Sequence, residues 1–373
     1  MSTTSSPLTA DVIQRLEIWP VDIPITDPFV VATGSRETAQ NLFMRVTLGD
    51  GTQGIGEAAP FPEVGDEDRI SCLAAATELA RTLVGQSVAD YAVLADRLTE
   101  QAPFHPAARC GLETAVLDAY CRSQAIPFWR LWGSADVRAR ETDITIPICS
   151  LGKTLELSRS WYAKGFRLFK MKIGTDVEQD ILRLHAVHDA LPDIGFIGDG
   201  NQGFSREDCI HFVSGVKQFG GRLVLLEQPV LREDLEGLQA IRHLTGIPVA
   251  ADESVRSLED ARRVVRLQAA DYINIKIMKT GVLEARRIAA FALSAGLRLM
   301  IGGMLETRIA MGCSFGLVLG LGGFDVLDLD TPLLFSTDPV LGGYRYDGPL
   351  LHPWHQPGLD MQVPCQTDCM IVQ

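Results

Sequence analysis

The sequence lacks several features that would place it in a class at once. It contains no run of 18 apolar residues, so we expect no membrane-spanning helix. Its first residues lack the basic segment and apolar core of a secretion signal, which predicts a cytoplasmic protein. A Walker phosphate-binding loop is absent. The formal net charge of −13 argues against nucleic acid or an anionic membrane as a partner.

Cysteine is present without a pattern. The eight cysteines are scattered among mostly apolar neighbours, and no CxxC motif occurs. Cys365 and Cys369 are separated by three residues in a polar segment. We therefore expect reduced, buried thiols, with neither structural disulfides nor a zinc site.

The chain divides into two regions with different patterns. Residues 11–56 alternate like strands, with Gly51 after Asp50 marking a hairpin turn, and residues 67–125 carry apolar residues at helical spacing. This order predicts an α+β domain over residues 1–135. From about residue 142, strands and helices alternate strictly. We predict eight strands, at 143–149, 166–174, 194–201, 223–229, 248–254, 271–277, 297–303 and 324–330.

The ends of these eight strands recur at a nearly constant interval. Taking positions 145, 172, 199, 227, 252, 276, 302 and 328, successive steps are 24 to 28 residues. One strand, one helix and two short loops occupy about that length, so the pattern predicts a closed parallel α/β barrel over residues 140–332. Residues 333–373 show no further strand–helix unit, and we expect them to return to the N-terminal domain.

Three consecutive predicted strands end in an acidic residue: Asp199 in GDGN, Glu227 in EQP and Asp252 in ADES. Because active sites of α/β barrels lie at the C-terminal ends of the strands, these carboxylates should meet at one rim. Their mutual repulsion calls for a cation, and hard oxygen ligands suit Mg²⁺, with Mn²⁺ as a substitute. For one acid alone, capping a neighbouring helix would be a reasonable alternative.

Lysines flank the three acids along the chain. Lys170 and Lys172 share a strand face, and Lys276 ends the sixth strand, four strands away in the barrel. Neighbouring ammonium groups and a divalent cation should lower a lysine pKa toward the value that a general base requires. The alternative is that these lysines only balance the acids. Two bases on opposite sides of one metal predict removal and return of a proton next to a substrate carboxylate, with inversion of that carbon.

These residues lie in motifs that closely resemble the enolase superfamily, in its muconate-lactonizing branch. The similar segments include GDGNQGF, LLEQPV, ADESV, DYINIKIMKTGV and GGMLET. The resemblance implies a (β/α)7β barrel with an α+β capping domain. It further implies that Asp199, Glu227 and Asp252 bind Mg²⁺, that Lys172 and Lys276 are the acid/base pair, and that Lys170 is auxiliary.

Within this branch the chain is most similar to dipeptide epimerases. Asp328 and Asp330 resemble a D-x-D motif whose acids hold the α-ammonium group of the substrate, and residues two apart share a face. The implied reaction inverts the second residue of a dipeptide by 1,1-proton transfer through an enediolate. N-succinylamino acid racemase, o-succinylbenzoate synthase and muconate cycloisomerase of the same branch are the alternatives, as is an inactive barrel that only binds.

Specificity is expected from two loops of the capping domain, at about residues 25–36 and 57–66. L-Ala-D/L-Glu epimerases tend to carry an arginine where this chain has Gly34; Arg36 lies two residues on. Glu63 with Asp66 leaves room for a cationic second residue, and an apolar one is equally open. Further candidates for substrate binding are Asn201 and Glu306. We also expect a homo-oligomer.

Overall fold

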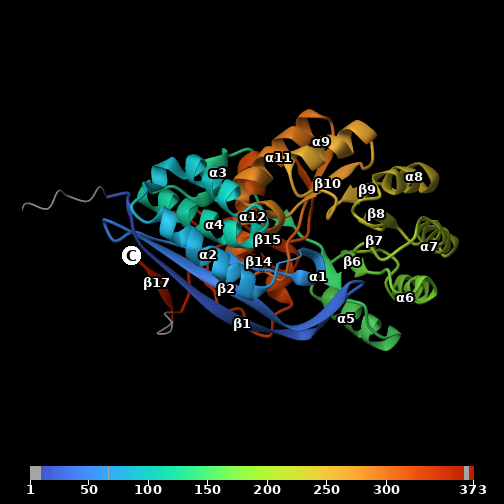
Figure 1. Cartoon of the computed structure of the whole chain (residues 1–373). Coiled ribbons are helices and arrows are strands. Elements are labelled where there is room, and N and C mark those ends of the chain that lie inside the picture. The colour runs from blue at the N-terminus through green and yellow to red at the C-terminus, as the bar shows by residue number, and fades with distance from the viewer. Residues whose placement is uncertain (1–9, 66, 365–368) are drawn as a thin grey trace, which may run out of the picture.

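The long hairpin at the start of the chain forms the base of the capping domain (Figure 1). The computed structural model describes residues 10–65, 67–364 and 369–373. The predicted meander and the helices that follow it are confirmed. They are β1 (Ile13–Val31), β2 (Gly34–Leu48), β3 (Gln53–Ala58), α1 (Pro62–Gly65), α2 (Arg69–Leu83), α3 (Tyr91–Gln101) and α4 (Pro106–Ser123).

The turn between β2 and β3 lies where the sequence predicted it. Gly51 has φ +88°, a backbone conformation that side chains rarely adopt, and the N–H of Leu48 donates to the carbonyl of Thr52. Residues of β3 pack so closely on α4 that a Cβ at Gly56 would come 2.0 Å from the carbonyl oxygen of Gly111. The helices therefore lie directly on this sheet.

All eight predicted barrel strands are confirmed, and they form one parallel sheet in sequential order. The N–H of Asp143, at the start of the first strand, donates to Leu327 of the last (2.9 Å), which brings the two edges of the sheet together. The strands are β5 (Ile144–Ile146), β6 (Leu168–Lys172), β7 (Gly195–Asp199), β8 (Leu223–Glu227), β9 (Val249–Ala251), β10 (Tyr272–Ile275), β11 (Arg298–Ile301) and β12 (Phe324–Leu327).

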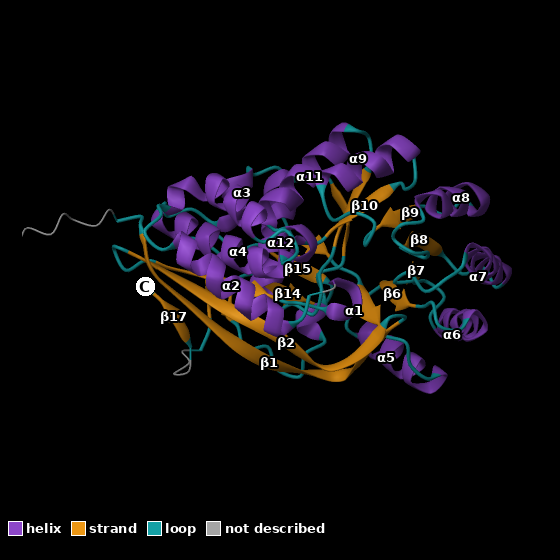
Figure 2. Ribbon diagram, viewed as in Figure 1, coloured by secondary structure: helices purple, strands orange, loops and turns teal. Residues whose placement is uncertain are grey.

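The helices between these strands cover the outside of the barrel, as Figure 2 shows for α6, α7 and α8. They are α5 (Leu151–Ala163), α6 (Val177–Ala190), α7 (Arg206–Gln218), α8 (Leu235–Thr245), α9 (Leu258–Leu267), α10 (Ile277–Thr280), α11 (Val282–Ser294) and α12 (Arg308–Leu321). The architecture is a (β/α)7β barrel with a capping domain.

Local sequence fixes where these helices begin. A serine, threonine or aspartate side chain accepts a backbone N–H of the first turn at α5, α6, α7, α8, α9 and α12, from Ser150, Asp176, Ser205, Asp234, Ser257 and Thr307 respectively. Helix α11 follows Gly281, which has no side chain for this purpose. Glu113 of α4 takes that role, because its carboxylate accepts the N–H groups of Val282 (2.7 Å) and Leu283 (2.9 Å).

The interior of the barrel is apolar directly beneath its mouth. Ile197, Leu225 and Ala250 lie two positions before Asp199, Glu227 and Asp252, and they form a separate buried cluster with Tyr272 and Met300. Because side chains two apart on a strand share a face, this apolar cluster lies directly beneath the acidic residues inside the barrel.

Part of the C-terminal segment returns to the capping sheet. Strand β17 (Met370–Val372) pairs antiparallel with β1, with Leu16 opposite Val372 (Figure 1). Before it, β14 (Arg345–Asp347) and β15 (Leu350–His352) extend β4 (Arg140–Glu141), and β13 (Leu341–Gly342) pairs with β16 (Met361–Gln362). The exact domain boundaries stay predictions. No helix in the described part of the chain has the length and apolar character needed to cross a membrane.

The cysteines of the described residues are free thiols, and most are buried. Burial raises the pKa of Cys72 and Cys110 well above the usual value and that of Cys209 to about 12. Such thiols are inert at neutral pH. Cys365 lies outside the described residues.

Candidate active site

The five residues that the sequence placed at strand ends all reach the mouth of the barrel. Lys172, Asp199 and Glu227 are the last residues of β6, β7 and β8, while Asp252 and Lys276 directly follow β9 and β10. Each of these side chains is at most 6% exposed. The barrel therefore gathers three carboxylates and two ammonium groups in a space that excludes most water.

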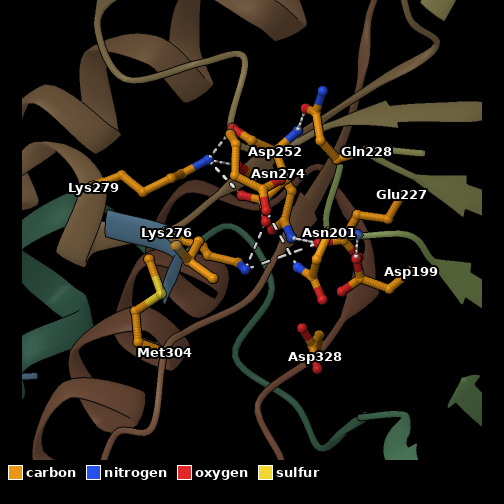
Figure 3. A network of polar contacts seen from close by, with 12 residues as sticks. Asp199, Asn201, Glu227, Gln228, Asp252, Asn274, Lys276, Lys279, Met304 and Asp328 are labelled. Carbon is orange, nitrogen blue, oxygen red and sulfur yellow. Dashed lines mark hydrogen bonds and ion pairs between the residues drawn. The ribbon is translucent and has the colours of Figure 1, made fainter. Parts of the chain in front are cut away.

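The lysines occupy the two ends of the acidic row. Lys172 Nζ lies 2.6 Å from Asp199 Oδ2. Lys276 Nζ lies 2.7 Å from Asp252 Oδ2 (Figure 3). Since β7, β8 and β9 are neighbours in the sheet, Glu227 stands between the other two acids. Two ammonium groups thus face one row of acids from its opposite ends.

Lys170 is the most buried of the lysines and joins several acids. Its Nζ lies 2.6 Å from Asp328 Oδ2, 2.8 Å from Glu227 Oε2 and 3.0 Å from Asp199 Oδ2. The sequence predicted that neighbouring ammonium groups and a bound divalent cation would lower the pKa of one lysine. Burial acts in that direction, but Asp199, Asp328 and Glu227 outweigh it, and the pKa of Lys170 is raised well above the usual value. The acids that would bind the predicted cation pair here with Lys170, so the lowered lysine pKa stays a prediction for the metal-bound site.

The same balance applies to the other members of the site. Burial lowers the pKa of Lys276, yet Asp252 and its neighbours raise it above the usual value. Lys170 and Lys172 overcome the effect of burial at Asp199 and lower its pKa to about 2. The site is thus a set of ion pairs in a dry environment, where the ammonium groups lower the pKa of Asp199 and Asp252 despite burial. Glu227 differs, because burial and the neighbouring Asp199 raise its pKa to about 8.

Lys279 belongs to this group and was missed by sequence reasoning. Its Nζ lies 2.7 Å from Asp252 Oδ1 and 3.0 Å from the carbonyl oxygen of Asn274 (Figure 3). The signal was present in KIMK: a helical turn, α10, starts at Ile277 and brings Lys279 back toward Lys276. Burial lowers the pKa of Lys279, despite its contact with Asp252. The two carboxylate oxygens of Asp252 are consequently paired with two different lysines, Lys276 and Lys279.

Two amides orient the charged groups. Asn201 Oδ1 accepts from Lys172 Nζ at 3.1 Å, and its Nδ2 donates to Glu253 Oε1 at 3.2 Å. Asn274 Nδ2 donates to Glu227 Oε1 at 2.7 Å. These bonds fix the side chains that would otherwise rotate, so the acid–lysine geometry is established in advance.

The donor set fits a hard divalent cation. Asp199 and Glu227 already converge on one cation, the Lys170 ammonium, and Glu227 and Asp252 converge on another, with Lys276 Nζ 3.9 Å and 2.7 Å away. Carboxylate oxygens from adjacent strands that meet around one positive charge are the ligands Mg²⁺ uses in proteins. The donor set thus has the chemistry for such an ion.

Acids also cluster at the end of β12, next to this site. Asp328 lines the central cavity. Asp330 is buried, and its Oδ2 accepts the N–H of Thr145 at 2.6 Å. Asp143, which the sequence reasoning did not single out, offers oxygen atoms within 4.8 Å of both. Burial, together with the neighbouring Asp328, raises the pKa of Asp330 to about 7 and the pKa of Asp143 well above its usual value.

The central cavity is covered by the two capping loops. Phe29 and Val31 from the tip of the hairpin, and Phe61 and Val64 from the region of α1, line it together with Met304 and the lysines. The rings of Phe29 and Phe61 meet edge to face at 6.4 Å. The remaining volume is only about 20 Å³. A substrate can therefore enter only if these loops move.

A surface ion pair connects the two loops. Arg36 Nε lies 2.7 Å from Glu63 Oε1, and a second bond of 3.1 Å joins Nη2 to Oε2. Gly34 makes room for Glu63, since a Cβ there would come 2.4 Å from Glu63 Cγ. Arg36 and Gly34 thus hold the loops together and are not among the described residues that line the cavity. Asp66 lies outside the described residues.

Glu306 is buried behind the cavity wall. Its Oε1 accepts the N–H of Met304 at 2.7 Å, and burial raises its pKa to about 8. Met304 itself lines the cavity. Glu306 consequently supports the loop that carries Met304.

Comparison with known proteins agrees with this geometry. A family model described as the mandelate racemase / muconate lactonizing enzyme N-terminal domain matches residues 14–133, and one described as enolase C-terminal domain-like matches residues 153–364. An L-Ala-D/L-amino acid epimerase of Populus trichocarpa is 40% identical over 342 residues, which cover 90% of this chain and 81% of that protein.

Two further proteins are similar over nearly their full length. An aromatic dipeptide epimerase of Herpetosiphon aurantiacus is 41% identical over 337 residues, covering 90% of this chain and 94% of that protein. A solved structure of a dipeptide epimerase from Enterococcus faecalis V583, complexed with Mg and the dipeptide L-Leu-L-Tyr, superposes with a TM-score of 0.90 at 28% identity. That match covers 94% of this chain and 99% of the other.

Proposed function

Because the chain belongs to the mandelate racemase / muconate lactonizing enzyme family of the enolase superfamily, we propose that it is a Mg²⁺-dependent dipeptide epimerase that inverts the α-carbon of the second residue. One observation carries the proposal: Lys172 and Lys276 face the row of acids from opposite ends, 2.6 Å and 2.7 Å from the outer two. Two bases on opposite faces of one carbon are what an inversion requires.

In this proposal Asp199, Glu227 and Asp252 hold the metal ion. When bound, Mg²⁺ would neutralise the substrate carboxylate and stabilise the negative charge that develops on it. Asn274 keeps Glu227 in place by its 2.7 Å hydrogen bond. Acids that held the ion would pair less strongly with Lys276, so the raised pKa of this lysine would fall toward the value that a base needs.

The chemical step moves one proton off the substrate and another onto it. One lysine, in its neutral form, accepts the α-proton, and the electron pair of the C–H bond is delocalised into the carboxylate as an enediolate. The opposite lysine donates a proton to the other face of the carbon, which forms the new C–H bond. Asn201, bonded to Lys172 at 3.1 Å, keeps that amine aimed at the cavity. Lys170 acts as an auxiliary positive charge between Asp328 and the two metal-binding acids Asp199 and Glu227.

The acids that follow β12 provide a contact for the amino end of a dipeptide. Asp328 faces the cavity, with Asp330 and Asp143 behind it. A carboxylate group of this kind suits an α-ammonium group. The apolar residues that line the cavity with the lysines include Val31, Phe61, Val64 and Met304, which favour an apolar side chain on the second residue. Arg36 and Glu63 neutralise each other outside this wall. The homo-oligomer expected from the sequence stays a prediction.

The test is exchange of the α-proton in D₂O with Mg²⁺, followed by NMR and mass spectrometry over a library of L,L-dipeptides. We expect deuterium at the second residue only, accompanied by the L,D product, and the highest rates for apolar second residues. Turnover of an N-succinylamino acid or a succinylbenzoate precursor, without exchange in any dipeptide, would overturn the proposal in favour of the other members of the branch.

A further inference from the structure

A second and larger cavity lies beside the central one. It has a volume of about 340 Å³ and is lined by residues of β1, β5, α5 and the segment that follows β12. Phe29 and Thr145 line both cavities. The two spaces are therefore neighbours that share a wall, and the larger one has room for a side chain that the central cavity cannot hold.

The chain itself runs from one cavity to the other. Asp328 and Thr331 line the central cavity, and Leu333 and Leu334, a few residues on, line the larger one. Thr145 stands at the same boundary, because its N–H donates to Asp330 at 2.6 Å. A group bound at Asp328 thus lies close to the wall that the two cavities share.

The larger cavity is lined by apolar side chains and by charged side chains that are paired with one another. Ile25, Leu157, Trp161, Leu333 and Leu334 are half-buried apolar side chains that line it and pack against the main core. At the rim, Lys153 Nζ lies 2.8 Å from both Asp27 Oδ1 and Glu156 Oε1, and the ammonium of Lys164 lies over the Trp161 ring at 3.8 Å. Because these charges are already paired, the interior favours an uncharged, apolar occupant.

We propose that this cavity, called here the first-residue pocket, binds the side chain of the first residue of the dipeptide and selects large apolar side chains there. The proposal rests on the proposed function, in which the α-ammonium group of that residue lies at Asp328. From that point the side chain of the first residue extends past Thr145 and Phe29 toward Leu157 and Leu334. Burial of a large apolar side chain there adds binding free energy that glycine or alanine cannot supply.

The experiment compares a series of dipeptides that differ only in the first residue: Gly-L-Leu, L-Ala-L-Leu, L-Leu-L-Leu and L-Phe-L-Leu. We expect kcat/KM for epimerisation to rise at least tenfold from glycine to leucine or phenylalanine. Ser160 also lines the pocket and is exposed, so Ser160→Trp fills it with little risk to folding. This variant should lower kcat/KM at least tenfold for the phenylalanine dipeptide and leave Gly-L-Leu within twofold of the unmodified enzyme.

The matched control is Ala163→Trp, which places the same side chain at another exposed position of α5 that is not part of the pocket. It should leave the whole series unchanged. A flat series, or an equal effect of Ser160→Trp on all four dipeptides, would overturn the first-residue pocket while the epimerase activity stands. Absence of exchange in every dipeptide, Gly-L-Leu included, would instead overturn the proposed function, so the two failures are distinguishable.

Discussion

Glu57 of the capping sheet binds Thr307 at the start of barrel helix α12. The carboxylate accepts the backbone N–H of Thr307 at 2.9 Å and its hydroxyl at 2.7 Å, and it also accepts the N–H of Ala310. Asn41 donates to the same carboxylate at 2.7 Å and to the carbonyl of Leu305 at 2.8 Å. The barrel mouth and the cap are thus joined by a buried acid that satisfies a helix N-terminus.

We expect Glu57→Gln to destabilise the protein by about 1–3 kcal/mol. Both carboxylate oxygens accept N–H groups, so whichever way the amide is turned, its NH₂ group faces a donor. The measurement is urea unfolding at pH 7.5. Glu78→Gln, at an exposed position of α2, is the matched control and should change stability by less than about 0.5 kcal/mol. Equal stability of the two variants would contradict this reading of Glu57.

Glu113 predicts a pH dependence of stability. Burial raises its pKa from 4.5 to about 7 in the folded protein. A carboxyl group with a raised folded pKa contributes stability that is fully present below pH 4.5 and is lost as the pH rises to about 7. Glu113→Gln keeps the carbonyl oxygen for Val282 and Leu283 but does not titrate. Its stability relative to the parent should therefore rise by on the order of 1–3 kcal/mol between pH 5 and pH 8.

The measurement for Glu113 is the free energy of unfolding of both proteins at several pH values. Taking the difference between them cancels the titration of every other group. A difference that stays constant with pH would show that this carboxyl group titrates alike in the folded and unfolded states.

Replacing each of the two lysines singly should show which lysine exchanges the proton on each face of the α-carbon. Lys172→Met and Lys276→Met should each lower epimerisation by about 10²–10⁴-fold, since inversion needs both. Each variant should keep slow exchange of the α-proton in one epimer of the dipeptide and lose it in the other. ¹H NMR in D₂O measures both. Lys217→Met, on α7 and bonded to the carbonyl of Thr245, should change neither rate; exchange of both epimers in either site variant would contradict the assignment.

Removal of divalent cations should abolish the activity. After dialysis against EDTA, we expect no epimerisation, full recovery with Mg²⁺, and a melting temperature that rises with Mg²⁺ concentration. A saturating ion at 100 times its Kd adds about 2.7 kcal/mol of stability. Asp199→Asn should lose the Mg²⁺ dependence of the melting temperature. Unchanged activity in the chelated enzyme would rule out the metal site proposed for the three acids.

Asp328→Asn should lower kcat/KM about 10- to 100-fold for dipeptides with a free amino group, because a charge-assisted contact to the ammonium is lost. The same dipeptide with an acetylated amino group should lose far less. Since Asp328 also pairs with Lys170 at 2.6 Å, a general disturbance of the site would lower both substrates equally. Asp325→Asn, an exposed acid of the same strand paired with Arg298, is the control.

Much of the fold could be predicted because the barrel repeats one unit. The interval of 24 to 28 residues between strand ends located every barrel strand and placed Lys172, Asp199, Glu227, Asp252 and Lys276 at one rim. The alternation of side chains on a strand then gave their inward direction. Such inferences depend on local periodicity alone, which a single sequence carries.

Contacts between distant segments could not be predicted in the same way. The role of Glu113 at α11, 169 residues away, depends on how the cap is oriented on the barrel. The pairing of Arg36 with Glu63 depends on how two loops fold together within the cap. Asp143 was missed because it precedes the first barrel strand, whereas its neighbours in space, Asp328 and Asp330, follow the last one. The raised pKa of Lys170 likewise depends on the summed field of acids from three strands.

The pairing of β17 with β1 has a consequence for how the protein is made. A ribosome that has finished Ile18 must add 352 further residues (370 − 18) before Met370, its partner, exists. At ordinary rates of synthesis that takes about 20 to 70 s. Throughout this time the edge of β1 at residues 16–18 lacks its partner strand, and its unpaired backbone groups are a template for pairing with another chain. Neighbouring ribosomes on one messenger carry many copies of that edge, so translation speed and chaperone supply should govern the yield of this protein.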